Sequence, residues 1–239
     1  MSKVVTSTVL PRDGFDTLNI GATGDTVAIA GDSLNTNVLQ DAGGNNIFTS
    51  SSGTVSSTPL QGSLQLLSTQ TASNSASVSF TTQLTSTYDV YKFMFIDINP
   101  ATNDTGFAVN FSSDGGSTYA VTKTTTSWRA SHTENDASAE ITYATGNDLA
   151  QSTAYMTIAA SLPNGADEST GGEMYLFAPS STTYVKQFYS TAISYLGTGA
   201  YNWFREGYCN TTSAINAVNF KAQSGNFDGI IKLYGISKT

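Results

Sequence analysis

The sequence predicts an all-β chain whose larger part is an antiparallel, jelly-roll-like β-sandwich. Short segments rich in Val, Ile, Thr, Tyr and Phe recur along the chain, with turn residues between them. Two segments, Val78-Ser79-Phe80 and Val218-Asn219-Phe220, alternate apolar and polar residues as a half-buried strand does. No segment shows the apolar periodicity of an α-helix, so two packed sheets are the expected architecture.

Residues 1–59 are expected to form an extended arm or a short β shaft. Their apolar residues come in short strips, roughly nine or ten residues apart, with Gly-, Asp- and Asn-rich turns between them. The strips are Leu18-Asn19-Ile20, Val27-Ala28-Ile29, Val38-Leu39, Ile47-Phe48 and Val55. Each strip is too short to bury a core alone, so burial must come from outside the arm. We expect identical neighbouring chains to supply it; another protein, or the second domain beneath a draped arm, are the alternatives.

Ser56-Ser57-Thr58-Pro59 is expected to be a linker, and residues 60–239 to form the β-sandwich domain. Tyr88–Ile98 is apolar on both faces apart from Lys92 and Asp97, as in a central strand of a two-sheet stack. The predicted strands are Leu64–Thr71, Ala76–Thr81, Tyr88–Ile98, Phe107–Ser112, Tyr119–Arg129, Glu140–Tyr143, Ala154–Ala160, Glu173–Phe177, Tyr184–Tyr195, Trp203–Asn210, Ile215–Lys221 and Phe227–Ile236.

Charge and hydropathy exclude several classes of partner. The chain has 10 basic and 18 acidic residues, a formal net charge of −8, and no basic cluster to neutralise phosphates. We therefore expect no binding to nucleic acid or to an anionic membrane surface. No apolar stretch approaches the length that spans a bilayer, and the first residues, Met1 to Val5, contain no apolar core of a signal peptide. Membrane insertion and signal-directed secretion are not expected.

The residues needed for common catalytic and metal sites are scarce. Cys209 is the one cysteine, so no intrachain disulfide can form, and we expect a small buried thiol. His132 is the one histidine and lies in a polar segment predicted to be a solvated loop. One His and one Cys are too few for a zinc site, and no nucleophile elbow accompanies His132. No metal, cofactor or enzymatic activity is expected.

Carboxylates and one turn motif are further candidates for chemistry. Paired acids can cleave glycosidic bonds or bind calcium, but the candidates lie in Gly- or Asn-rich segments, where solvated turns are expected. They are Glu134, Asp136, Asp148, Asp167 and Glu168. Ser112–Tyr119 matches the S-x-D-x-G-x-T-aromatic Asp-box, which is expected to form a hairpin with Asp114 capping backbone donors. Sialidases repeat this box, whereas this chain has it once.

Four aromatic residues are the candidate contact sites. Trp128 stands beside Arg129, and Tyr201, Trp203 and Phe204 fall in Gly197–Phe204, a segment interpreted as a loop. Tyr and Trp bury a large area at low entropic cost and suit contacts with a glycan or a protein. The competing interpretation is that alternate members of this set fill the sandwich core.

Several segments resemble a known class of protein. Within Val38–Ser50, the run Asp41-Ala42-Gly43-Gly44-Asn45-Asn46-Ile47 resembles a D-x-G-G-N-x-I segment of tailed-bacteriophage appendage proteins. Leu64–Phe80, Tyr88–Pro100 and Phe177–Lys186 are similar to a C-terminal β module of phage structural proteins. The resemblance implies a homotrimeric component on the exterior surface of the virion, with other virion proteins as partners. It carries no catalytic signature.

The functional expectation is therefore a non-catalytic structural protein of a tailed-phage virion. Residues 1–59 would anchor and oligomerise the chain, and the β-sandwich would be displayed as a short fibre or appendage for host adsorption. A capsid decoration protein that cements neighbouring subunits is one alternative. A carbohydrate-binding module that recognises host surface glycans through its aromatic residues is the other.

Overall fold

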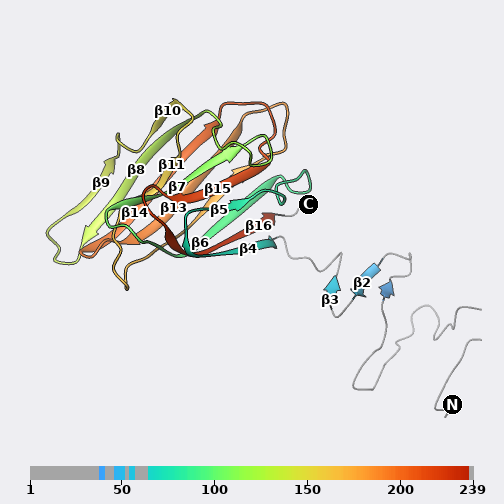
Figure 1. The fold of residues 1–239 in the computed structure, drawn as a ribbon, viewed down its shortest axis with the longest axis horizontal. Coiled ribbons are helices and arrows are strands. Elements are labelled where there is room, and N and C mark those ends of the chain that lie inside the picture. The colour runs from blue at the N-terminus through green and yellow to red at the C-terminus, as the bar shows by residue number, and fades with distance from the viewer. Residues whose placement is uncertain (1–37, 41–45, 52–53, 57–63, 237–239) are drawn as a thin grey trace, which may run out of the picture. The chain divides into compact units, whose positions relative to one another are not determined.

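The computed structural model describes residues 38–40, 46–51, 54–56 and 64–236 of the chain. The chain divides into two units, residues 1–60 and residues 61–239, and each is described by itself. The described residues contain strands and no helix, so none of them forms a helix that could cross a membrane (Figure 1). The predicted all-β class is confirmed.

The first unit contains a small antiparallel sheet. Its strands, in the order β1-β2-β3, are β1 (Val38–Gln40), β2 (Asn46–Ser51) and β3 (Thr54–Ser56). The later apolar strips of the predicted arm lie in these strands, and the strips Leu18–Ile20 and Val27–Ile29 lie outside the described residues. The anchoring and oligomerising role of this segment stays a prediction.

The second unit is an antiparallel β-sandwich made of two unequal sheets, which confirms the predicted architecture. The larger sheet has nine strands in the order β10-β8-β14-β13-β12-β6-β16-β4, with β9 also paired to β8. These strands are β4 (Leu64–Ser75), β6 (Val90–Pro100), β8 (Lys123–Thr133), β9 (Ala139–Tyr143), β10 (Leu149–Ser152), β12 (Thr170–Phe177), β13 (Lys186–Tyr195), β14 (Gly199–Cys209) and β16 (Phe227–Ile236).

The smaller sheet has four strands in the order β11-β7-β15-β5. They are β5 (Val78–Phe80), β7 (Thr105–Ser112), β11 (Met156–Leu162) and β15 (Ala217–Ala222). Figure 1 shows these strands lying over the larger sheet, and the chain passes repeatedly from one sheet to the other. Strand neighbours are therefore mostly distant in sequence.

Aromatic packing between the sheets forms the centre of the core. Phe220 of β15 is fully buried, and its ring lies 5.2 Å from Phe93, 5.4 Å from Phe95 and 5.8 Å from Phe107, between ring centroids. Phe80 adds an edge-to-face contact at 6.2 Å. Such pairs stabilise a core beyond the area they bury, so Phe220 joins the small sheet to β6 of the large one.

Several strand assignments differ from the sequence prediction. The strand predicted from Tyr119 begins at Lys123, because Asn110 Nδ2 donates to the Tyr119 carbonyl at 2.6 Å and holds that segment as a loop. Strand β10 was not predicted, since its four residues, Leu-Ala-Gln-Ser, carry little alternation. The segment Gly199–Phe204, interpreted as a loop, belongs to β14 and pairs on both sides.

We predict that Phe220→Ala lowers the free energy of unfolding by about 3–5 kcal/mol, because a cavity opens where four other rings meet. Urea-induced unfolding followed by circular dichroism measures it. Phe177→Ala is the matched control, since Phe177 is only half-buried and its cost should be clearly smaller. Equal costs for the two variants would contradict this description of the core.

Candidate binding face of the nine-stranded sheet

The side of the nine-stranded sheet that points away from the four-stranded sheet is the candidate functional surface, called the outer face below. Side chains of a strand alternate between its two sides, so each strand contributes every second residue to this face. In β13 the buried residues are Lys186, Phe188, Ser190, Ala192 and Ser194. Their neighbours Gln187, Tyr189, Thr191, Ile193 and Tyr195 therefore form part of the outer face. Residues 64–236 contain no third sheet to cover it.

Aromatic rings occupy the middle of the outer face. Tyr175 of β12 stacks on Tyr189 of β13 with ring centroids 4.9 Å apart, and Phe177 adjoins both rings. Lys92 Nζ lies 5.1 Å from the Tyr175 centroid and 2.6 Å from the Glu173 carboxylate. The hydrogen bond to Glu173 is the main cause that raises the pKa of Lys92. This charge is thus paired beside the rings.

A second aromatic pair lies toward the β8 side of the sheet. Trp128 and Phe204 are cross-strand partners whose rings stack with centroids 3.7 Å apart and planes 7° from parallel. Glu206 Oε1 accepts a hydrogen bond from Trp128 Nε1 at 3.3 Å, and its Oε2 accepts one from the Thr126 hydroxyl at 2.6 Å. The carboxylate of Glu206 therefore fixes the orientation of the indole.

Beside this pair the outer face is hollowed. Two adjoining hollows, of about 290 and 370 Å³, share His132, Ile193 and Ala200 in their lining. Their lining has more apolar than polar surface, and small residues such as Ala130 and Ala200 leave the space open. Ile193 is 60% exposed at their edge, so a protruding side chain stands next to a depression.

Exposed aliphatic residues extend this surface to both edges of the sheet. Ile141 of β9 pairs with Ala130 and is 78% exposed. At the opposite edge, Leu64 and Leu66 of β4 pair with outer-face residues of β16 and are also exposed. Exposed apolar side chains therefore occur at both edges and in the middle of the outer face, with polar residues such as Thr191 and Asn202 between them.

The four aromatic residues singled out in the sequence do not form one patch. Trp128 and Phe204 lie on the outer face, whereas Trp203 is buried in the core and Tyr201 packs against that core. The loop interpretation of Gly197–Phe204 was wrong because Gly199–Phe204 is a strand, which sends neighbouring side chains to opposite sides. The expectation that alternate members fill the core is confirmed for Trp203.

Sequence reasoning missed Tyr175, Tyr189 and Ile193 on the outer face. The signal was the alternation in β13, but polar and apolar residues are mixed in both of its sets. The buried set contains Lys186, Ser190 and Ser194, whereas the exposed set contains two tyrosines and an isoleucine. Because the buried set also holds Phe188 and Ala192, and the exposed set also holds Gln187 and Thr191, hydropathy alone does not decide which set faces inward.

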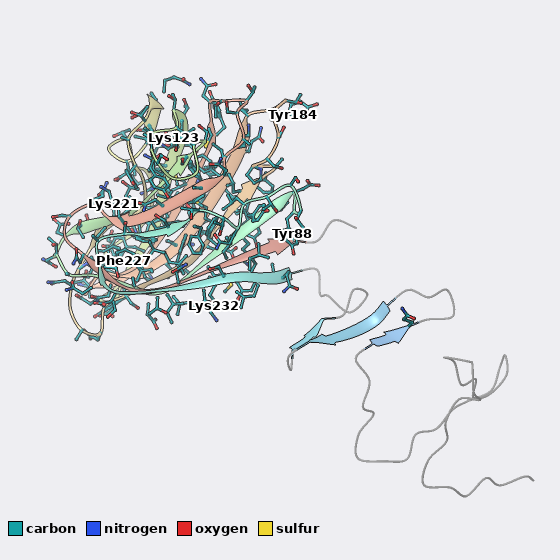
Figure 2. The ribbon with its side chains drawn as sticks, turned by 45° about the vertical axis from the view of Figure 1, so that its right-hand side comes forward. Tyr88, Lys123, Tyr184, Lys221, Phe227 and Lys232 are labelled. Carbon is teal, nitrogen blue, oxygen red and sulfur yellow. The ribbon has the colours of Figure 1, made fainter. Side chains whose placement is uncertain are left out.

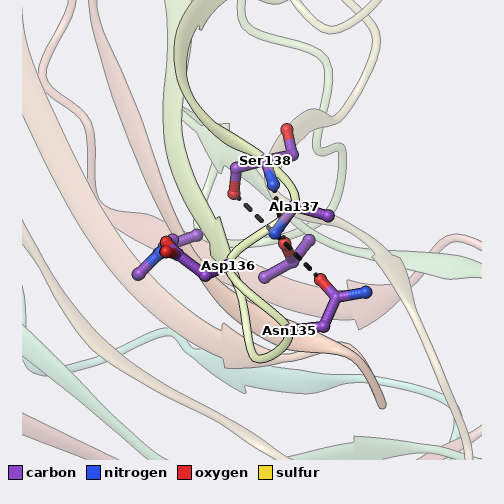
Figure 3. A network of polar contacts seen from close by, with 6 residues as sticks. Asn135, Asp136, Ala137 and Ser138 are labelled. Atoms are coloured by element: carbon purple, nitrogen blue, oxygen red, sulfur yellow. Dashed lines mark hydrogen bonds and ion pairs between the residues drawn. The ribbon is translucent and has the colours of Figure 1, made fainter.

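His132 is the penultimate residue of β8 and does not lie in the predicted loop. Its side chain is nevertheless exposed. Its Nε2 is 2.9 Å from Asp136 Oδ1 in the β8–β9 hairpin. Figure 3 shows this hairpin, where Asn135 Oδ1 accepts a hydrogen bond from the Ala137 N–H at 3.1 Å. The polar side chains of this segment therefore stabilise a turn.

Two other candidate carboxylates also serve local structure. Glu168 Oε2 accepts a hydrogen bond from the Gly165 N–H at 2.6 Å, and Asp148 accepts one from the Tyr143 hydroxyl at 2.9 Å. Within the described part of the chain, no three or more His, Cys, Asp or Glu residues are grouped so as to hold a metal ion.

The Asp-box is a turn device, but it is not the predicted hairpin. Asp114 Oδ1 accepts hydrogen bonds from Ser112 Oγ at 2.6 Å and from the Thr118 N–H at 2.9 Å, as expected for a cap. Gly115 and Gly116 adopt positive φ angles of 74° and 89°. The flanking strands β7 and β8 belong to different sheets, so the motif forms a crossover between sheets.

Comparisons with protein-family models, with curated proteins and with solved structures found no match to this chain.

A row of buried titratable groups lies on the inner side of the same sheet. Lys186, Cys209 and Lys123 are consecutive cross-strand partners, and all three are fully buried, which confirms the buried thiol. Lys123 Nζ donates to the carbonyls of Val121 at 3.0 Å and Ala154 at 2.7 Å. Burial lowers the pKa of Lys123 to about 8, lowers that of Lys186, and raises that of Cys209 to about 12.

We predict that the free energy of unfolding rises by roughly 1 kcal/mol between pH 8 and 9. The folded-state pKa of Lys123 is below its ordinary value of 10.5, so in this range the unfolded chain binds more protons than the folded one. Chemical denaturation at each pH measures the slope of the free energy of unfolding against pH. We expect the Lys123→Met variant to have a smaller slope.

Above pH 9 the buried thiol opposes this trend. The folded-state pKa of Cys209 lies above its ordinary value of 9.0, so its contribution to stability is lost as the pH rises from 9 toward 12. In the Cys209→Ala variant, the free energy of unfolding should therefore continue to rise above pH 9. Identical slopes between pH 8 and 9 in the wild type and in Lys123→Met would contradict the assignment to Lys123.

Proposed function

We propose that this chain is a non-catalytic assembly protein whose outer face packs against a second copy of the chain. The observation that carries the proposal is the set of exposed apolar side chains on the outer face, which includes Ile141 at one edge, Ile193 and Tyr189 in the middle and Leu66 at the other edge. The setting is the one that the sequence resemblance implies: a homotrimeric fibre or appendage on the exterior of a tailed-phage virion, with the sandwich displayed for host adsorption.

The composition of the outer face supports a protein interface. Contiguous exposed apolar surface is uncommon on monomers and marks contact sites, and interface cores are rich in aromatic residues and Met and poor in charge. The tyrosine cluster has these properties, and Lys92 is neutralised by Glu173. Glu206 keeps its negative charge, but its carboxylate is hydrogen-bonded to Trp128 and Thr126.

The shape of the outer face supports the proposal that a second copy of the chain packs against it. Ile193 projects directly beside the hollows lined by Ala130 and Ala200. When Ile193 of one copy enters the hollow of the next copy, the contact is head-to-tail and can close into a ring of three copies. Burying the outer face would remove the cost of keeping apolar surface in water.

We predict that Ile193→Glu weakens self-association at least tenfold, because it places a carboxylate in an apolar contact. Size-exclusion chromatography with light scattering over a concentration series measures it, and the wild type should approach three times the 25.1 kDa mass of one chain. Tyr184→Glu is the matched control. Tyr184 is 70% exposed but lies in the β12–β13 connection, at an end of the sandwich (Figure 2).

Two results would contradict this function. One is a wild-type chain that stays monomeric at tens of micromolar, on the order of the concentrations at which weak interfaces form. The other is an Ile193→Glu variant that associates as the wild type does, which would move the contact to another surface, such as residues 1–59.

Glycan binding is the second candidate function, and the stacked Trp128–Phe204 pair favours it. The pair adjoins the hollow lined by Asn202, whose Oδ1 accepts from the Thr191 hydroxyl at 2.9 Å. An aromatic surface beside an amide and the Glu206 carboxylate can pack against the apolar side of a sugar ring and hydrogen-bond its hydroxyls.

For this second function we predict that Trp128→Ala lowers glycan affinity tenfold or more, through the loss of ring contact. A broad glycan array, followed by calorimetry on the best ligand, measures it, with Tyr184→Ala as the control. Trp203→Ala is unsuitable because Trp203 is buried in the core. A wild-type chain that binds nothing on the array would exclude this function for the glycans tested.

A further inference from the structure

The inner side of β14 carries a fully buried arginine that contacts no carboxylate. Arg205 Nε donates to the Thr157 carbonyl of β11 at 2.8 Å, and Nη1 donates to Ser127 Oγ and, at 3.4 Å, to the Phe204 carbonyl. All these acceptors are neutral. Buried charges in proteins are normally paired, since removing an ion from water without a partner is costly. The guanidinium of Arg205 therefore lacks a counter-charge.

A second guanidinium shares the same indole. Arg205 lies 5.1 Å and Arg129 5.6 Å from the centroid of the Trp203 ring, between guanidinium carbon and centroid. Arg129 is paired with Glu140 at 2.9 Å, so the cluster keeps one uncompensated positive charge. Glu206, the next residue after Arg205, bonds to Trp128 and Thr126 on the outer face. It does not reach into the core.

Four buried polar atoms of this region have no hydrogen-bond partner among the described residues: Arg205 Nη2, Trp203 Nε1, Arg129 Nε and Ser190 Oγ. They belong to three adjacent strands, and Ser190 is the direct cross-strand partner of Arg205, as Arg129 is of Trp203. Ser190 and Ala192 of β13 stand opposite Arg205 and Trp203, so small side chains face the large donors.

These orphaned groups share one chemical character. The guanidinium and indole nitrogens are donors only, and the serine hydroxyl can also donate. A water molecule placed among them could accept two hydrogen bonds but would need acceptors for its own protons, and it would leave the charge in place. A small anion accepts from every donor and neutralises the guanidinium.

We propose that the sandwich interior binds a monovalent anion of the chloride class on the inner side of β13 and β14, held by Arg205 Nη2 with Trp203 Nε1 and Ser190 Oγ as further donors. The anion completes the hydrogen bonds of the core and ties β14 to β13. Because it binds the folded chain only, it stabilises that state by mass action.

Equilibrium urea unfolding at constant ionic strength tests this inference, with sodium gluconate replaced stepwise by sodium chloride or bromide. Each sample refolds in its own salt, so the buried site equilibrates. For the wild type we expect a saturable response, in which the unfolding constant falls about 100-fold when halide reaches about 100 times its dissociation constant. An unfolding constant that is the same in halide and in gluconate would overturn the proposal.

Variants localise the effect. Arg205→Met should abolish the halide response. Trp203→Phe and Ser190→Ala each remove one donor with a small change of side chain, and they should weaken the halide response. These two variants test the site if Arg205→Met does not fold. Lys221→Met is the matched control, because Lys221 is a cation placed over Tyr155, away from this cluster, and should respond as the wild type. A response unchanged in all three site variants would place halide binding elsewhere and overturn the proposal.

Crystals of protein purified and crystallised in sodium bromide give the direct readout. We expect an anomalous difference peak within hydrogen-bond distance of Arg205 Nη2. Density there that refines as water without an anomalous signal, or no density at all, would refute the anion site even if halide stabilised the protein.

Discussion

The packing of a four-stranded sheet against one side of a nine-stranded sheet is the constraint on which the rest of this structure depends. Four strands can bury only one side of the larger sheet, and Phe220 anchors that contact against β6. The opposite side is left to water or to a partner. Because strand side chains alternate, every residue of the larger sheet is assigned to one of these two environments.

The two sides of the larger sheet do not follow the usual division into an apolar interior and a polar surface. Toward β8 the interior holds Lys123, Lys186 and Arg205, each bonded to backbone carbonyls, while the outer face carries stacked tyrosines and exposed isoleucines. Beside a core of aromatic rings, this sheet thus buries three cations and leaves other aromatic rings partly exposed, which departs from the usual distribution of charged and aromatic side chains. The exposed apolar residues of the outer side underlie the proposed contact with a second copy, and the unpartnered donors of the inner side underlie the proposed anion site.

Only part of the candidate surface could be predicted from the sequence. The aromatic character of Trp128 and Phe204 was evident, and both lie on the outer face. Trp203 was grouped with them, although it stands one residue from Phe204 and points to the other side. The hollows needed the pairing of β8 with β14, since Ala130 is distant in sequence from Ile193 and Ala200. No local sequence pattern predicts that these residues line one hollow.

The sequence by itself determined the β class, the positions of most strands, the buried thiol of Cys209 and the capping by Asp114, because alternation, turn chemistry and side-chain size act over a few residues. The tertiary structure alone decided which side of each strand faces inward, which strands are neighbours, and that the Asp-box joins two sheets. Alternation divides a strand into two sets of residues without saying which set is buried. That choice depends on pairings such as Ser190 with Arg205 and Trp128 with Phe204, and only the folded chain brings these residues together.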